Sequence, residues 1–180
     1  MLYATSHGQT RTIAEELATR LRSHGHVVEL ADVASHPVPP TSCDAVILGS
    51  RVEMGKHARS IVRYIEANRD ALAALPTAFF SVSNAAATSS APDPMGYLER
   101  LFATVGWRPT RAIAFAGGLP YRKYGWLLRM IMKQINKRTG NPTDTSRDYV
   151  FTRWDEVERF ADELSVDLAP QTKVEPAGAA

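Results

Sequence analysis

The stretch LYATSHGQTRTIAEEL, residues 2–17, runs from an apolar segment through a polar turn into a helical pattern. The apolar run Leu2–Thr5 predicts a short strand. Apolar residues at helical spacing predict a helix over Thr10–Ser23, which Gly25 is placed to end. The intervening loop Thr5–Thr10, TSHGQT, therefore lies between the end of a strand and the beginning of a helix.

This loop has the composition of an anion site. The N terminus of a helix carries unpaired N–H groups and the positive end of the helix dipole, both of which favour an anion. The loop contains no lysine and matches neither G-x-x-x-x-G-K-[ST] nor G-x-G-x-x-G, which argues against a nucleoside triphosphate with magnesium and weakens a dinucleotide. Its three hydroxyls and Gly8 suit a phosphate monoester bound by neutral donors. An ordinary helix cap, which uses the same residue types, is the alternative.

The rest of the chain alternates strand-like and helix-like segments. The predicted strands are Leu2–Thr5, Val27–Val33, Ala45–Gly49, Thr77–Ser83 and Arg111–Ala116, with a short one at Tyr149–Thr152. The predicted helices are Thr10–Ser23, His57–Leu75, Met95–Val105, Trp126–Lys137 and Trp154–Leu164, the last preceded by Thr152 and Asp155 at the spacing of a capping pair. This alternation predicts an α/β three-layer sandwich with five parallel strands in the order 2-1-3-4-5. In that order, the ligand crevice opens at the carboxyl ends of strands one and three.

The bulk composition is that of one globular domain. The chain has 180 residues, of which 44% are hydrophobic and 22% are charged, with a net charge of +2. We predict one domain over residues 1–165 and an Ala/Pro-rich disordered tail over residues 166–180. We find neither a signal peptide nor an apolar run of membrane-spanning length, and the single Cys43 cannot form an internal disulfide. These features predict a cytoplasmic protein.

Two further loops are expected at the same edge of the sheet as the first. They are Gly49–Ala58 after the third strand and Ser81–Pro94 after the fourth. Both are longer than packing requires, which is typical of functional loops. Together with TSHGQT, in which Gly8 and Thr10 occupy matching places, they make the chain resemble the flavodoxin family.

That resemblance implies FMN as the cofactor, with its phosphate in the first loop and its ring between the other two. The implied cofactor-binding residues are Thr5, Ser6, His7, Gly8, Gln9, Thr10, Ser50, Arg51, Val52, Glu53, Met54, Gly55, Ser83, Asn84, Ala85, Ala86 and Ala87. Neither ring loop carries the Trp or Tyr that many flavodoxins stack on the flavin, which leaves the ring open to a substrate. We predict no metal site.

A basic insert separates the fifth strand from the last helix. Residues 117–148 carry seven basic and two acidic residues. On a helical wheel Arg129, Lys133 and Lys137 form one stripe, opposite a face of apolar residues. Such a helix is typical of a segment that lies on an anionic membrane or over an acidic, hydrophobic ligand. An ordinary surface helix with its apolar face turned inward has the same pattern.

The segments GWRPTRAIAFAGGLPYRKYGWLLRMIMK and TDTSRDYVFTRWDEVERFA, within residues 106–161, resemble the menaquinone-dependent protoporphyrinogen oxidases of bacterial haem biosynthesis. That family consists of long-chain flavodoxin relatives with a basic, aromatic insert at this position. The resemblance implies the removal of six electrons from protoporphyrinogen IX, in two-electron steps, through FMN to menaquinone or another membrane quinone. It also implies peripheral contact with the inner face of the cell membrane through residues 121–138.

Roles for individual residues follow from that reaction, although no side chain is an obvious general base and the catalytic residues stay unknown. The predicted substrate-binding residues are Arg122 and Lys123 for the two propionates and Tyr121, Tyr124 and Trp126 for the ring. Arg51 and Lys56 are further candidates for the propionates. His7 and His57 are expected at the mouth of the site, as surface or capping residues. Alternative functions are an electron-carrier flavodoxin and an FMN-dependent quinone reductase, and no motif for nucleic-acid binding is present.

Overall fold

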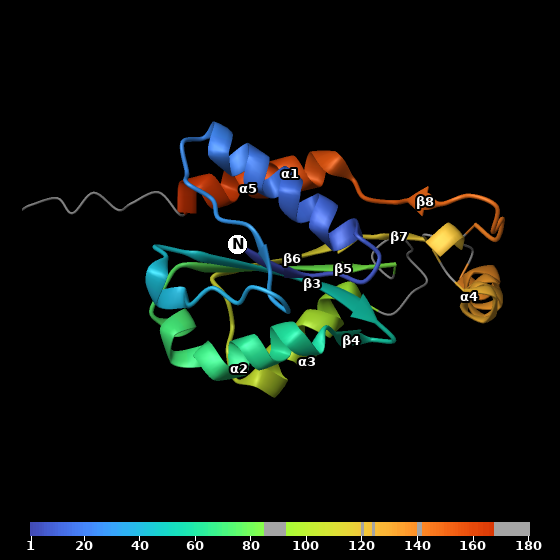
Figure 1. Ribbon diagram of the computed structural model, residues 1–180, viewed down its shortest axis with the longest axis horizontal. Coiled ribbons are helices and arrows are strands. Elements are labelled where there is room, and N and C mark those ends of the chain that lie inside the picture. Colours follow the sequence, from blue (N-terminus) through green and yellow to red (C-terminus); the bar gives the residue numbers. More distant parts are fainter. Residues whose placement is uncertain (85–92, 120, 124, 140–141, 168–180) are drawn as a thin grey trace, which may run out of the picture.

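The structure is a computed structural model that describes residues 1–84, 93–119, 121–123, 125–139 and 142–167 (Figure 1). The strands are β1 (Leu2–Ala4), β2 (Ala31–Asp32), β3 (Val46–Glu53), β4 (Lys56–His57), β5 (Thr77–Ser83), β6 (Arg111–Ala116), β7 (Gly118–Leu119) and β8 (Tyr149–Val150). The helices are α1 (Gln9–Ser23), α2 (Arg59–Ala73), α3 (Pro94–Val105), α4 (Trp126–Thr139) and α5 (Trp154–Asp167), with 3-10 turns η1 (Pro40–Ser42) and η3 (Tyr121–Lys123).

The central sheet has the predicted strand order. Its five parallel strands run β2-β1-β3-β5-β6, which is 2-1-3-4-5 when they are counted along the chain, and β4 pairs antiparallel with the end of β3. β3 and β5 pair in parallel from Val46 opposite Thr77 to Arg51 opposite Val82. The winding reverses between β1 and β3, so the carboxyl ends of these two strands mark the expected ligand crevice.

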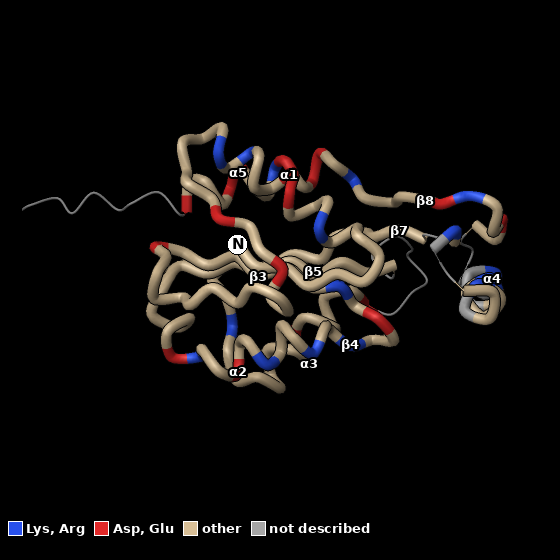
Figure 2. The backbone as a smooth tube through the Cα atoms, in the orientation of Figure 1, with Lys and Arg blue, Asp and Glu red and all other residues tan. Residues whose placement is uncertain are grey.

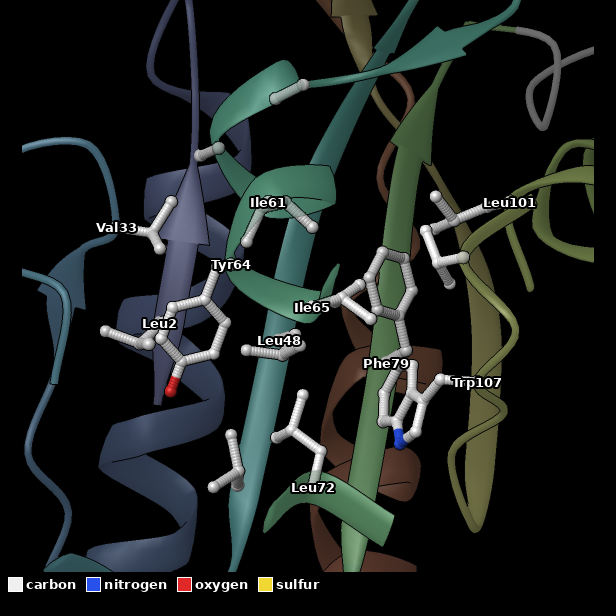
Figure 3. Packing of buried hydrophobic residues seen from close by; sticks show 14 of the residues in the cluster. Leu2, Val33, Leu48, Ile61, Tyr64, Ile65, Leu72, Phe79, Leu101 and Trp107 are labelled. Carbon is white, nitrogen blue, oxygen red and sulfur yellow. The ribbon is translucent and has the colours of Figure 1, made fainter. Parts of the chain in front are cut away.

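Helices cover both faces of the sheet. α1 and α5 pack on one face, and α2 and α3 pack on the other (Figure 1). All seven residues of β5 are buried, and its successive side chains alternate between two cores. Phe79 packs with α2 and α3, where Figure 3 shows it near Ile65 and Trp107, whereas Phe80 packs with α1 and α5. A strand buried on both faces is typical of a parallel sheet with helices on either side.

The predicted strand over Val27–Val33 is too long. β2 contains only Ala31 and Asp32, which pair with Leu2 and Tyr3 of the three-residue strand β1. A ladder at the sheet edge can extend only as far as its single partner, which explains why β2 is short. Val27 is fully exposed, whereas Val28 and Leu30 pack against the core beneath α1.

Residues 49–58 form a hairpin in place of the predicted loop. β3 continues four residues past Gly49, to Glu53, and turns back into β4 through Met54 and Gly55. Both turn residues have positive φ, 49° and 75°, as a two-residue hairpin turn that follows the sheet twist requires. The helix predicted from His57 therefore begins only at Arg59.

The basic insert has a small core of its own. β7 and β8 form a two-stranded antiparallel sheet, on which Leu119 and Tyr121 are fully buried against Met132, Tyr149 and Phe151. α4 thus lies at the end of this extension, away from the central sheet (Figure 1). At the C terminus, α5 includes Val166 and Asp167, so the helix continues two residues into the predicted tail. Residues 168–180 of that tail lie outside the described part of the chain.

Candidate functional site

The loop after β1 presents the N terminus of α1 to the crevice. Gly8 precedes the helix in a left-handed conformation, with φ 99°, and its N–H donates to the Thr5 hydroxyl at 3.0 Å. Among the described residues, the structure gives this end of α1 no side-chain cap, and its first turn contains no acidic residue. The first-turn amides are therefore available to an anion.

Thr10 adds a buried hydroxyl to these amides. Its side chain belongs to α1 and only 2% of its surface is exposed. The side chain stands in the first turn of the helix, beside the amides that precede it. Amides and a hydroxyl are the donor set that a phosphate accepts from, so the loop fits the phosphate of a flavin nucleotide.

A second contact fixes the loop to the far end of the chain. The Gln9 amide Nε2 donates to the Thr152 hydroxyl at 2.8 Å, and that hydroxyl donates to the Ala116 carbonyl at 2.7 Å. The Thr152 hydroxyl therefore uses its hydrogen bonds on the loop residue Gln9 and on Ala116, the last residue of β6. The prediction that Thr152 caps the helix together with Asp155 is wrong. α5 begins at Trp154, and the N–H groups of Glu156 and Val157 donate to the Arg153 carbonyl.

The β3–β4 hairpin lies at the same edge of the sheet. Ser50 is fully buried and holds the hairpin, accepting from the Ala58 N–H at 3.1 Å and donating to the Arg51 carbonyl at 3.0 Å. Val52 is half-buried and Glu53 is exposed. Met54, at the tip, is 97% exposed, so its side chain is free to contact a ligand or partner.

Arg51 connects this hairpin with the phosphate loop. Its Nε donates to the Ser6 hydroxyl, and the same nitrogen lies 3.4 Å from a carboxylate oxygen of Glu53. These contacts bring together two of the three predicted cofactor segments. The sequence showed both residues as candidates, but not that they meet.

The third predicted segment is described only in part. Ser83 is buried, and its carbonyl accepts from the Gly117 N–H at 2.9 Å, while Asn84 is half-buried. Ser83 is the last residue of β5 and Asn84 follows it, at the carboxyl edge of the sheet where β5 pairs with β3. The predicted contacts of Ala85, Ala86 and Ala87 lie outside the described residues.

His57 differs from its prediction. It is neither a surface nor a capping residue, because β4 buries it to 9% exposure with its ring against Phe79, the two centroids 5.6 Å apart. Burial, with a smaller contribution from the charge of Arg100, lowers the pKa of His57 to about 4. The imidazole is therefore neutral at physiological pH. His7 is half-buried within the loop.

Sequence reasoning missed Tyr97 at this edge. A Cβ placed on Gly55 would lie 3.3 Å from a ring carbon of Tyr97, and the Arg100 guanidinium stands over the same ring, 4.9 Å from its centroid. An aromatic ring and a cation from α3 thus border the hairpin. Their spacing in the sequence is that of an ordinary helix, so only the packing of α3 on β4 reveals them.

The predicted substrate-binding residues of the insert differ in exposure. Tyr121 is fully buried and its hydroxyl donates to the Pro142 carbonyl at 2.8 Å, so its ring offers no surface to a substrate. Arg122 is exposed, with its Nε on the Ser146 carbonyl at 3.2 Å, and Trp126 is 74% exposed. Tyr124 and the side chain of Lys123 lie outside the description.

α4 exposes Leu127 and Ile131 of its apolar face, which an ordinary surface helix, one of the two alternatives, would turn inward. Beside Trp126, the exposed fractions are 58% for Leu127, 61% for Met130 and 49% for Ile131. Lys133 and Lys137 are exposed on the same helix, whose basic residues Figure 2 shows at the far end of the insert. Among the described residues, none of the helices is long and apolar enough to cross a bilayer.

The parallel sheet in this strand order, with helices on both faces, defines an α/β protein of flavodoxin type. The model of the flavodoxin domain matches residues 1–146. The chain belongs to the flavodoxin family, whose fold binds flavin. Solved structures agree on the fold: Bacillus cereus flavodoxin 1 superimposes with a TM-score of 0.52 at 14% identity, covering 93% of this chain and 94% of that one. A flavodoxin from the domain Archaea gives a TM-score of 0.50 at 15% identity, covering 93% and 95%.

Curated relatives are closer in sequence. The protoporphyrinogen IX dehydrogenase (quinone) of Escherichia coli K12 is 32% identical over 168 residues, which cover 92% of this chain and 93% of that protein. A Leishmania major protein of the same name is 30% identical over 177 residues, covering 92% and 73%. A match over 92% of the chain cannot omit residues 117–148, so the similarity includes the insert.

Proposed function

We propose that the protein is an FMN-dependent oxidoreductase that converts protoporphyrinogen IX to protoporphyrin IX and delivers the electrons to a quinone. The observation that carries the proposal is similarity to relatives named for this activity, which extends across the insert as well as the flavodoxin core. The conversion removes six electrons and six protons from the substrate, in three two-electron steps.

The chain provides a site for FMN at the crevice edge of the sheet. The first-turn amides of α1 and the Thr10 hydroxyl would hold the phosphate, and the hairpin and the end of β5 would flank the ring. When bound, the flavin supplies the two-electron chemistry, and the protein supplies binding and orientation. The hydrogen bonds from Gln9 to Thr152 and from Thr152 to Ala116 hold the phosphate loop in place against the end of β6, where the loop would position the cofactor.

The insert supplies groups suited to a large, apolar dicarboxylate. Arg122 lies on η3, where its backbone N–H donates to Asp148 at 2.8 Å and its Nε to the Ser146 carbonyl. These bonds orient the guanidinium, whose remaining N–H groups suit a propionate. Lys123, the next residue in the sequence, is a second cation, and Trp126 provides an exposed aromatic surface for the ring.

α4 is the segment that brings the site to a quinone dissolved in a bilayer. Its exposed apolar side chains and flanking lysines have the composition of a helix that lies in an anionic membrane interface. We therefore place the protein at the inner face of the cell membrane as a peripheral protein, with menaquinone as the acceptor. Binding to sedimented vesicles that contain anionic lipid tests this part, and Met130→Asp should release the protein.

Anaerobic turnover tests the proposed reaction. FMN-loaded protein is mixed with protoporphyrinogen IX and a menaquinone analogue, and porphyrin fluorescence is followed against a flavin-free control. We expect formation that depends on both FMN and quinone. Arg122→Gln should raise KM without loss of FMN, whereas Arg63→Gln, an exposed arginine of α2, should behave as wild type. No turnover by FMN-loaded protein would contradict the proposal and leave an electron carrier or another quinone reductase.

A further inference from the structure

Arg51 is the cation that the fold brings to an otherwise neutral phosphate loop. The loop Thr5–Thr10 contains no lysine or arginine, and the first turn of α1 contains no carboxylate. Arg51 comes from β3, 45 positions away from Ser6, and donates through Nε to the Ser6 hydroxyl. The charge therefore reaches the loop only through tertiary structure.

Strand register determines where this side chain points. Side chains alternate along β3, so that Val46 and Leu48 pack in the core beneath α2, whereas Ile47 packs in the core beneath α1. Arg51 has the parity of Ile47 and lies on the α1 side of the sheet, the side on which the phosphate loop begins its helix. Its position is thus set by a buried strand rather than by a mobile surface loop.

The guanidinium retains donors for an anion. Nε serves both Ser6 and Glu53, and within the described part of the chain the structure gives the two Nη groups no acceptor. The side chain is 29% exposed, so these groups are partly desolvated but accessible. Glu53 is more exposed, at 46%, and its oxygen is 3.4 Å away, which makes its compensation of the positive charge incomplete.

We propose that Arg51 binds the phosphate of the flavin nucleotide and makes the site selective for FMN over riboflavin. The proposal rests on the proposed function insofar as the loop holds a flavin. It assigns Arg51 to the phosphate, and not to the ring or to a substrate propionate. A guanidinium gives a phosphate dianion charge-assisted hydrogen bonds, which neutral hydroxyls and amides alone cannot match. Glu53 competes with the phosphate for the same cation.

Flavin titration of the purified apoprotein tests this without any turnover. Quenching of flavin fluorescence gives Kd for FMN and for riboflavin, in wild type, Arg51→Gln, Glu53→Gln and the control Arg63→Gln, an exposed arginine of α2. We expect R51Q to weaken FMN binding about ten- to a hundredfold. Riboflavin affinity should not change, and E53Q should strengthen FMN binding. Added salt should weaken FMN binding in wild type more than in R51Q.

Several results would overturn the proposal. An equal loss of both flavins in R51Q would make Arg51 a structural support of the hairpin, and no loss of either would exclude it from the site. A wild type that binds FMN and riboflavin equally well would also overturn the assignment. A wild type that binds neither flavin would overturn both this inference and the proposed function. Selective FMN binding without porphyrinogen turnover would overturn only the proposed function.

Discussion

Gln9 and Thr152 are joined by a hydrogen bond of 2.8 Å between side chains 143 positions apart. Gln9 belongs to the phosphate loop and Thr152 follows the insert, so the bond connects the loop with the segment that leads into α5. Thr152 is 8% exposed, and its hydroxyl donates a hydrogen bond to the Ala116 carbonyl at the end of β6. This pair holds the insert and the cofactor loop at fixed positions on the same sheet.

Replacing Thr152 by Val should therefore destabilise the protein. The change keeps the shape but leaves the Gln9 amide and the Ala116 carbonyl without their partner, which costs about 1–3 kcal/mol of unfolding free energy. Urea unfolding followed by circular dichroism measures it, and FMN affinity should fall as well. Thr152→Ser, which keeps the hydroxyl, is the control. If the Val and Ser variants were equally stable, the hydrogen bonds would be unimportant.

Tyr121 should stabilise the insert without affecting the central sheet. Tyr121→Ala removes a fully buried ring from the core formed with Tyr149 and Phe151, which costs about 3–5 kcal/mol locally. Hydrogen exchange should rise over residues 117–150 while β3 and β5 stay protected. Trp126→Ala, at an exposed position, should change stability by less than about 0.5 kcal/mol. Unaltered exchange in the insert would show that this core does not hold it.

His57 should make stability depend on pH in a defined window. Burial lowers its pKa from 6.5 to about 4, so between these values the unfolded chain binds more protons than the folded one. Stability should thus be complete above pH 6.5 and decrease as the pH falls to 4, by about 3 kcal/mol in total. Denaturant unfolding at each pH measures this loss. His57→Phe should abolish that part of the slope and His36→Gln, at an exposed position, should retain it. An equal slope in H57F would exclude His57 as its source.

Asp162 should stabilise the contact of α5 with α1. Hydrogen bonds from Arg20, with a smaller contribution from His24, lower the pKa of Asp162 from 3.8 to about 2. Its contribution is present above pH 3.8 and is lost as the pH falls towards 2. Asp162→Asn should lower Tm at pH 7 by about 2–4 °C, a difference that disappears near pH 2. Asp155→Asn, on the same helix, is the control. Calorimetry showing the same difference at both pH values would contradict this assignment.

The sequence by itself determined the fold class and the strand order, because both follow from local periodicity and from the few topologies that parallel connections allow. Thr77–Ser83 and Arg111–Ala116 were predicted with their observed bounds. Local composition also predicts an anion site at TSHGQT, since a hydroxyl-rich turn before a helix is a local feature, and this site stays a prediction. The sequence did not indicate that residues 49–58 form a hairpin. Lys56 and His57 become a strand only by pairing with Glu53 and Val52 at the end of β3.

Tertiary structure alone decided which side chains meet at the site. Arg51 reaches Ser6 because strand register turns it towards α1, and Gln9 reaches Thr152 because α5 packs beside α1. The same packing buries His57 and Tyr121, both of which had been expected near the surface or on a ligand. Burial and contact between distant segments are properties of the assembled cores, and no periodicity within one segment encodes them.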